Sequence, residues 1–285
     1  MNNKSYMVVV PYYNDYNNLC LLLQDIARTN QRFKPEKILI IDDGSDKSIE
    51  DISNKYNISL LPDISIKRTD HLGVKNAINI GLNQVDSDYA IILHSDTRLL
   101  SPNTNSYVHK DVLSVLFYHC SDVEDAMTVS CFSLSDIDGS TSNDYVSRGF
   151  RHVNINHDEK FISIPYNRYR FASLKTQSHI GWFRVLSVSD NIFTLNMNLF
   201  REIDGFDNTI SEYGYYLDDF LGKSRSKGYH TYFTYDTVAF HERQKKKSEN
   251  SLAVYKQEDF ELFCNKWINN DIWKEVSLWR EVSYE

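Results

Sequence analysis

The stretches VVVPYYN at 8–14, IIDDGS at 40–45 and IILHSD at 91–96 decide the fold of this chain. Each begins with β-branched or aliphatic residues, which is typical of a strand that is buried on both faces of a sheet. Segments with the apolar spacing of a helix, at 19–27 and 73–84, lie between these stretches. Because strands alternate with helices of about a dozen residues, we expect βαβ units and a mainly parallel sheet that is covered on both faces.

The rest of the chain is expected to add elements of both kinds. The first strand, at 5–10, should end before Pro11, since proline cannot donate a hydrogen bond within a sheet. Apolar runs predict further strands, helical spacing predicts further helices, and a stretch rich in Ser, Asp, Asn and Gly predicts a loop. The expected strands are 65–68, 126–134, 187–197 and 231–241, the loop is 136–147, and the helices are 46–55, 216–227 and one or two within 248–285.

The composition is that of a globular protein and argues against several functions. Of 285 residues, 41% are hydrophobic and 25% are charged, which is enough apolar material for a sizeable core. No apolar run approaches the roughly 18–20 residues that cross a bilayer, and no secretory signal is visible, so we expect a cytoplasmic protein with at most peripheral membrane contact. The net charge of −8 argues against binding to nucleic acid. The four cysteines form no CxxC pair and are interpreted as small core residues.

Carboxylates follow two of the buried strands. Asp42 and Asp43 end one strand and Asp96 ends another, while His241 ends a strand far along the chain. The carboxyl ends of parallel strands share one edge of a sheet, where ligands of such folds bind. Taken alone, each aspartate is explained as a helix N-cap. Together with a histidine they favour a divalent cation that holds a substrate carrying phosphate groups.

In their order and spacing, these motifs resemble the opening signatures of family 2 glycosyltransferases, enzymes with the GT-A fold. The resemblance runs from about residue 5 to 267 and includes GFD at 205–207, DD at 218–219, FHE at 240–242 and FCNKW at 263–267. It implies an α/β GT-A fold, with a Rossmann-like, mainly parallel sheet flanked by helices. It also implies a catalytic domain at 1–245, with a nucleotide-binding half at 1–100 and an acceptor half at 101–245, and a C-terminal helical tail at 246–285.

The resemblance assigns a nucleotide site to the first hundred residues. Pro11 and Tyr13 would flank the base, and Asp43 would accept a hydrogen bond from the imide N–H of a uracil. His94 stands where the family has the first aspartate of its DxD motif, and it would donate to the ribose or bind a metal such as Mn²⁺. Lys75 would bring positive charge to the diphosphate, and the alternative is that it is a solvated helix lysine.

A metal site is implied beside the nucleotide. Asp96 matches the last position of the DxD motif, which holds Mn²⁺ or Mg²⁺ in the family, and His241 would be a further ligand. Because His94 replaces a carboxylate, the negative charge around a cation is lower. Weak metal affinity or metal-independent catalysis is therefore the alternative.

The catalytic base is implied at the start of a helix. Inverting members of the family use an aspartate of a Glu-Asp segment to remove the proton of the acceptor hydroxyl. We assign this role to Asp218, with Asp219 as the second candidate, although an ungapped match counted back from Gly228 puts Leu217 there. Helix capping is the other explanation for acids in a first helical turn.

The resemblance predicts a glycosyltransferase that moves one sugar, with inversion, from a nucleotide sugar that is UDP-linked. The acceptor would be a saccharide or lipid-linked saccharide in the assembly of surface polysaccharides or glycoconjugates. A catalytically impaired nucleotide-sugar-binding protein of the same fold is the alternative, since His94 and Leu217 replace family acids. A retaining mechanism stays open as well. The tryptophans of the tail, at 267, 273 and 279, are expected to pack on the body or on a second copy in a homo-oligomer.

Overall fold

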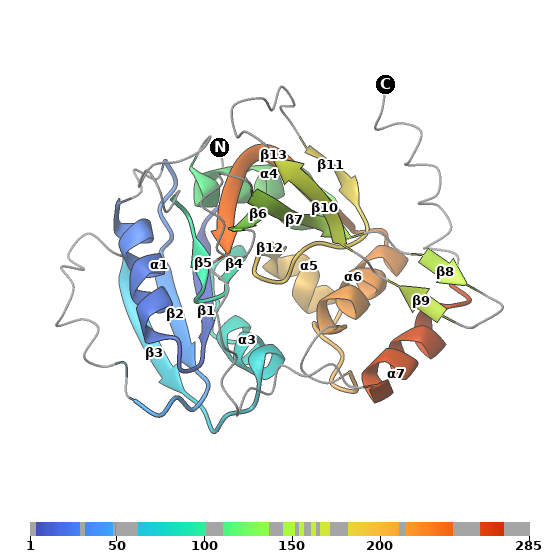
Figure 1. Ribbon diagram of the computed structural model, residues 1–285, viewed down its shortest axis with the longest axis horizontal. Coiled ribbons are helices and arrows are strands. Elements are labelled where there is room, and N and C mark those ends of the chain that lie inside the picture. Colours follow the sequence, from blue (N-terminus) through green and yellow to red (C-terminus); the bar gives the residue numbers. More distant parts are fainter. Residues whose placement is uncertain are drawn as a thin grey trace.

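The structure is a computed structural model of the chain (Figure 1). It describes residues 4–28, 32–47, 49, 62–100, 111–136, 145–151, 154–156, 161–163, 166–171, 182–210, 215–241 and 257–270. Most of the helix expected at 46–55, most of the loop expected at 136–147 and the end of the tail, with Trp273 and Trp279, lie outside the described residues.

A five-stranded sheet contains the three stretches that decide the fold. Its strands are β1 (Tyr6–Tyr12), β2 (Lys37–Asp42), β3 (Asp63–Arg68), β4 (Tyr89–Leu93) and β12 (Ile192–Asn196). They lie in the order β12-β4-β1-β2-β3, in which β1 to β4 are parallel and β12 is antiparallel to β4. The prediction of a mainly parallel sheet is confirmed for this layer.

Helices cover both faces of this sheet, as expected. Helix α3 (Val74–Leu82) packs on the face that presents Val9 and Ile92, and α1 (Tyr16–Arg28) and α4 (Val112–Asp122) pack on the other face. Helix α3 approaches β1 closely, because a Cβ atom on Gly81 would lie 2.4 Å from Cγ1 of Val9. A glycine is therefore required there for this packing.

Two strand boundaries that the sequence predicted are wrong. Strand β1 continues through Pro11, which pairs with Ile41 of β2. Strand β4 pairs with β1 only as far as Val9, so Pro11 lies where one neighbouring strand has already ended and its missing N–H is tolerated. The run expected at 187–197 is strand only over β12, because the chain at 187–191 has a single bridge at Ser187 and then turns at 190–191.

A second sheet, which the sequence did not predict, lies beside the first (Figure 1). Its strands are β5 (Thr97–Arg98), β6 (Ala126–Asp136), β7 (Tyr145–Arg151), β10 (Tyr166–Phe171), β11 (Trp182–Val185) and β13 (His230–His241). The pairs are antiparallel except for β6 with β13. The two sheets meet at Thr194 of β12, whose hydroxyl accepts from the Val129 N–H of β6 at 2.8 Å and donates to its carbonyl at 3.0 Å. Strands β8 (Asn154–Asn156) and β9 (Phe161–Ser163) pair separately.

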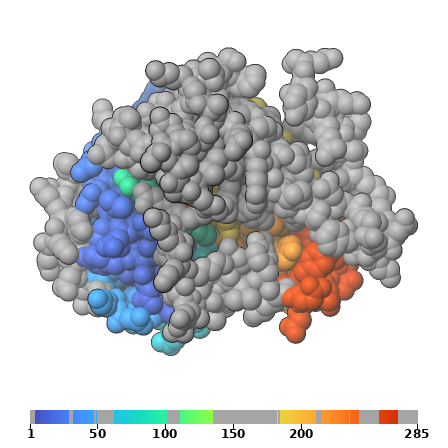
Figure 2. All heavy atoms as spheres, in the orientation of Figure 1, coloured from blue at the N-terminus to red at the C-terminus, as the bar shows by residue number. Residues whose placement is uncertain are grey.

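The remaining helices are α5 (Met197–Glu202), α6 (Tyr216–Ser226) and α7 (Gln257–Trp267). In the space-filling view α7 forms part of the surface on the side opposite α1 (Figure 2). Trp267 is buried in a small apolar cluster with Leu186 and Ile210, so this tryptophan packs on the body of its own chain. All four cysteines are buried, in agreement with their interpretation as core residues. None of the described helices is long and apolar enough to cross a membrane.

Candidate functional site

The loops that follow β1 and β2 are joined at one edge of the first sheet. Asn14 has a φ of 50°, in the left-handed region that asparagine tolerates better than most residues. Its N–H donates to the Ser45 hydroxyl at 2.9 Å, and its side-chain oxygen accepts from the Asp46 N–H at 2.8 Å. These contacts hold the two loops together before any ligand is present.

Asp42 closes the turn after β2. One of its oxygens accepts from the Ser45 N–H at 2.9 Å, and the other accepts from Arg68 of β3 at 3.0 Å. The carboxylate is buried, and a buried carboxylate requires such partners. Asp42 therefore has a structural role in this part of the sheet edge.

Asp43 holds the segment that leads into α3. Its carboxylate accepts from the Thr69 hydroxyl at 2.8 Å, from the Leu72 N–H at 2.7 Å and from the Gly73 N–H at 2.8 Å. The residue is 4% exposed. A carboxylate offers about four acceptor positions, and Nδ1 of His71 also lies 3.3 Å from Oδ2, so at most about one position is left for a nucleobase. The structure thus explains both aspartates of the pair by contacts within the protein.

Tyr13 forms an aromatic pair at the same edge. Its ring stacks on His71 with ring centroids 4.0 Å apart and an interplanar angle of 20°. Nδ1 of His71 lies 3.0 Å from the carbonyl oxygen of Asp43. Pro11 is buried within β1, two residues before Tyr13. Sequence reasoning missed His71, because the only local signal is its position in a polar loop after a short strand.

Asp96 and His241 meet although 145 positions separate them, which is the central feature of the site. Nε2 of His241 lies 3.0 Å from Oδ2 of Asp96, and both side chains are mostly buried. The contact arises because Thr97 of β5 pairs with His241 at the end of β13, which lies beside β5 and β4 in Figure 1. The second sheet therefore places His241 at the edge of the first sheet.

Several polar atoms around this pair lack partners. Within the described part of the chain, Oδ1 of Asp96, Nδ1 of His241 and Nε2 of His94 are buried and have no hydrogen-bond partner. Burial alone would raise the pKa of Asp96, but the neighbouring His241 and His94 outweigh it and hold that pKa below its ordinary value. Asp96 is therefore a carboxylate at neutral pH, with one buried oxygen that has no partner among the described residues.

The donor atoms of Asp96 and His241 are suited to a divalent cation. Carboxylate oxygen and imidazole nitrogen are ligands of Mn²⁺, and Mg²⁺ accepts the carboxylate. The described residues contain no cluster of three or more His, Cys, Asp or Glu side chains that could hold a metal. A cation here would consequently take much of its coordination from the phosphates of a substrate and from water.

A buried ion pair anchors the loop after β4. Arg98 of β5 donates to Asp25 of α1 through Nε at 2.7 Å and through Nη2 at 2.9 Å. Asp25 also accepts from the Leu99 N–H at 3.0 Å, and both charged residues are buried. This bidentate pair fixes the backbone two residues after Asp96.

Asp218 lies in the first turn of α6 and is 1% exposed. The Ser187 hydroxyl donates to its carboxylate. Ser187 begins the segment 187–191, and the carbonyl of Asn191 at its other end accepts from the His94 N–H at 2.9 Å. One short segment thus connects the carboxylate on α6 with the end of β4.

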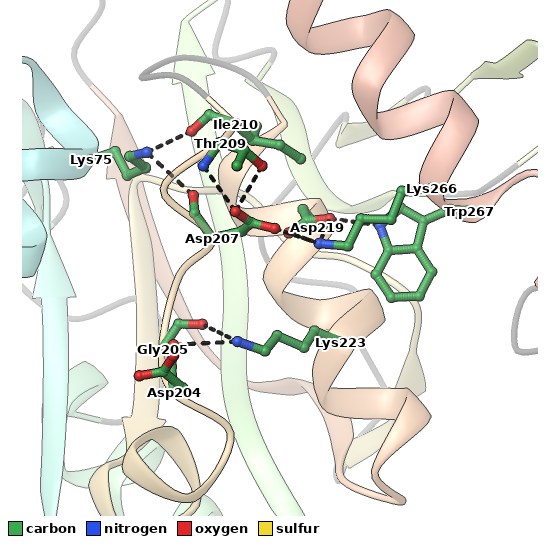
Figure 3. Close-up of polar contacts among 10 residues, drawn as sticks. All are labelled: Lys75, Asp204, Gly205, Asp207, Thr209, Ile210, Asp219, Lys223, Lys266 and Trp267. Atoms are coloured by element: carbon green, nitrogen blue, oxygen red, sulfur yellow. Dashed lines mark hydrogen bonds and ion pairs between the residues drawn. The ribbon is translucent and has the colours of Figure 1, made fainter.

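Asp219, the next residue, faces α7 instead. Its carboxylate accepts from Nε1 of Trp267 at 2.7 Å and from Nζ of Lys266 at 3.0 Å (Figure 3). The residue is fully buried, and this burial raises the pKa of its carboxyl despite the lysine. The two acids of the sequence motif therefore point to different partners.

Lys75 is buried, so the solvated alternative for this lysine is wrong. Its ammonium donates to the carbonyl of Ile210 at 2.5 Å and to that of Asp207 at 3.3 Å (Figure 3). These carbonyls lie 135 and 132 positions away, which no local pattern indicates. In this structure Lys75 joins α3 to the loop before α6.

Comparison with known proteins finds a family match in the first part of the chain. Residues 7–102 match the family model described as glycosyl transferase family 2. An undecaprenyl-phosphate 4-deoxy-4-formamido-L-arabinose transferase of Photorhabdus laumondii is 35% identical over 95 residues, or 33% of this chain and 29% of the relative. The enzyme of that name from Proteus mirabilis is 33% identical over 91 residues, or 31% of this chain and 28% of the relative. The chain thus matches less than a third of the length of these curated relatives.

Solved structures resemble nearly the whole chain. The structure of S. aureus TarS 1–349 in complex with UDP-GlcNAc matches with a TM-score of 0.61 and 15% identity, over 99% of this chain and 73% of that one. The structure of GalNAc-T7 with UDP, GalNAc and Mn²⁺ matches with a TM-score of 0.59 and 13% identity, over 85% of this chain and 44% of that one. At such identities the likeness concerns the fold, which is the GT-A fold as expected.

Proposed function

We propose that this chain, whose residues 7–102 match the model of glycosyl transferase family 2, transfers a sugar from a UDP-sugar to a saccharide or lipid-linked saccharide. The observation that carries the proposal is the Asp96–His241 contact at the carboxyl edge of the parallel sheet. This pair lies where ligands of α/β folds bind, and it has unpartnered polar atoms that a ligand would satisfy. A GT-A neighbour binds UDP and Mn²⁺, and another binds UDP-GlcNAc, which supports this class of donor.

The nucleotide would lie over the loops that follow β1 and β2. Tyr13 presents an aromatic ring to the base, Pro11 shapes the strand end beneath it, and Asp43 uses its remaining acceptor position for a uracil N–H. His94 is available to the ribose through its unpartnered Nε2. Lys75 supports this site by holding α3 against the loop at 207–210 rather than by contacting phosphate.

Asp96 and His241 would hold a divalent cation, Mn²⁺ or Mg²⁺, against the diphosphate. Such a cation supplies positive charge that stabilises the leaving diphosphate. The protein contributes a carboxylate with one unpartnered oxygen and an imidazole from another sheet, both held by the β5–β13 pairing. The small number of protein ligands fits a site that is completed by the substrate.

Asp218 would act as the base of an inverting reaction. The acceptor hydroxyl gives its proton to the carboxylate while its oxygen attacks the anomeric carbon, and the bond from that carbon to the diphosphate oxygen breaks. The Ser187 hydroxyl orients the carboxylate, and 187–191 connect it to the loop that carries His94. Asp219 is committed to Lys266 and Trp267, which leaves Asp218 as the better candidate.

The acceptor is proposed from the curated relatives. Both carry names of transferases that act on undecaprenyl phosphate, a lipid carrier. A lipid-linked acceptor in the assembly of a surface polysaccharide or glycoconjugate is the corresponding choice here. Such an acceptor would bring the enzyme to the membrane surface through its substrate.

The first experiment measures thermal stability with UDP, GDP, CDP and dTDP, each with and without Mn²⁺. A ligand present at about 100 times its Kd stabilises the folded state by roughly 2.7 kcal/mol. We expect a shift with UDP that increases with Mn²⁺ and loses its metal dependence in Asp96→Asn. No shift with any of the four nucleotides would contradict the proposed donor site.

Catalysis is tested by following UDP release from UDP-sugars with and without polyprenyl-phosphate and saccharide acceptors. We expect Asp218→Asn to lower the rate by about 10²- to 10⁴-fold with unchanged UDP binding. UDP binding without turnover under any condition would favour the alternative of a nucleotide-sugar-binding protein. NMR of the product's anomeric configuration distinguishes inversion from retention.

A further inference from the structure

Helix α7 contacts the first turn of α6 through two consecutive residues. Nζ of Lys266 lies 3.0 Å from Oδ2 of Asp219, and Nε1 of Trp267 lies 2.7 Å from Oδ1. Nζ of Lys266 also lies 2.8 Å from the Asp207 carboxylate in the loop before α6 (Figure 3). A single ammonium therefore links α7 both to the loop before α6 and to the helix that carries the proposed base.

The contact is built as a fixed support rather than as a surface ion pair. Asp219 is fully buried, Trp267 is 4% exposed and the Lys266 side chain is 35% exposed. Buried charge-assisted hydrogen bonds from two donors define the position of a carboxylate closely. The Lys266 hydrogen bond also holds the pKa of Asp207 far below its ordinary value, which keeps that acid charged and bound.

The apolar side of α7 supports the same region. Phe263 and Trp267 pack with Leu186 and Ile210 in one buried cluster. Leu186 precedes Ser187, which donates to Asp218, and Ile210 carries the carbonyl that Lys75 binds. The helix therefore braces both the segment that orients Asp218 and the loop that reaches α3.

Asp218 and Asp219 are neighbours on one helix, so their side chains point in directions about 100° apart. One is held by Ser187 and the other by α7. A shift of the α6 turn on the α7 side would displace the Asp218 carboxylate relative to the edge of the first sheet. Displacements of about 1 Å at a reacting group lower rates by up to roughly 10²-fold.

We propose that Lys266 and Trp267 of α7 are positioning residues for the sugar-transfer step, which they support by fixing the α6 turn that carries Asp218. This inference rests on the proposed function. According to this inference α7 belongs to the catalytic unit, because it binds Asp219, the residue next to the proposed base. The proposed nucleotide contacts of Tyr13, Asp43 and His94 come from the ends of β1, β2 and β4 and do not involve these two residues.

The test compares Lys266→Met with Lys223→Met in the full chain. Lys223 binds the same loop, through the carbonyls of Asp204 and Gly205 at 3.2 Å each, but it does not contact Asp219 (Figure 3). We expect Lys266→Met to lower kcat by about 10- to 100-fold with unchanged Kd for UDP. Lys223→Met is expected to keep both, and Lys266→Arg to recover most of kcat.

Each outcome of this test is decisive. Equal kcat for Lys266→Met and wild type would overturn the inference, as would a parallel loss of UDP affinity in a variant whose thermal unfolding matches that of the wild type. Trp267→Phe keeps an aromatic ring but removes the N–H, and it should lower kcat in the same way if Lys266→Met does not fold. Failure of the wild type to bind UDP or to release it from UDP-sugars would instead reject the proposed function.

Discussion

Two aspartates at the same edge of the first sheet, Asp43 after β2 and Asp96 after β4, are used in opposite ways. The Asp43 carboxylate accepts three hydrogen bonds from the segment that enters α3. Asp96 contacts His241, and its other oxygen has no partner among the described residues. Among the described residues, the fold satisfies the first acid almost completely and leaves one oxygen of the second without a partner. Aspartates at equivalent strand ends thus differ in how many of their carboxylate oxygens the surrounding protein supplies with hydrogen bonds.

The largest effect is expected where the loop after β4 is anchored. Arg98→Met leaves Asp25 buried without its cationic partner, and such losses cost about 3–5 kcal/mol. Urea unfolding of the variant measures this cost. A loss below about 1 kcal/mol would mean that Asp96 is held in place without the Arg98–Asp25 pair.

A smaller loss of stability is expected for Asp43→Asn. The amide group cannot accept from Leu72 and Gly73 on both of its ends, so at least one buried N–H loses its partner, which costs about 1–3 kcal/mol. Urea unfolding of Asp43→Asn and wild type, measured side by side, gives this difference. Unchanged stability would show that Asp43 is no more committed to the fold than Asp96.

Asp96→Asn should change stability by less than about 1 kcal/mol, because an amide can keep a hydrogen bond to His241. The variant should nevertheless lose the Mn²⁺ dependence of UDP binding. Calorimetric titration of UDP with and without Mn²⁺ provides the measurement. Retained metal dependence would assign the cation to other residues and remove the contrast with Asp43.

The smallest expected effect is a pH dependence of folding stability, and it concerns Asp207 and Asp219, the acids bound by Lys266. Lys266 lowers the pKa of Asp207, so this contact stabilises the folded state above the unfolded-state pKa of about 3.9, and the contribution is lost as pH falls. Burial raises the pKa of Asp219, so without Lys266 its charge is costly at pH 7 but not once it is protonated. The stability difference between wild type and Lys266→Met should therefore shrink below about pH 4. Unfolding curves at pH 7 and pH 3.5 test this, and an equal difference at both values would contradict it.

Much of the donor side could be predicted from sequence because its signals are local. The apolar runs of β1, β2 and β4 indicate buried strands, and the polar residues after them necessarily come to one edge of a parallel sheet. Even here the pattern did not show how far each aspartate is satisfied. The partners of Asp43 lie 26 to 30 positions away, in a loop with no distinctive motif.

The sequence by itself determined the parallel layer, its helices and the acids at its edge, since these follow from apolar periodicity and turn chemistry over a few residues. The tertiary structure alone decided which acid keeps an oxygen without a partner among the described residues, because that depends on partners distant in the chain. Pairing of β5 with β13 places His241 beside Asp96, whereas the Asp219 carboxylate is hydrogen-bonded to Trp267 of α7. Likewise, the Lys75 ammonium donates to carbonyls of the loop at 207–210. A buried ammonium needs acceptors, and the packing of the helices places these carbonyls next to it.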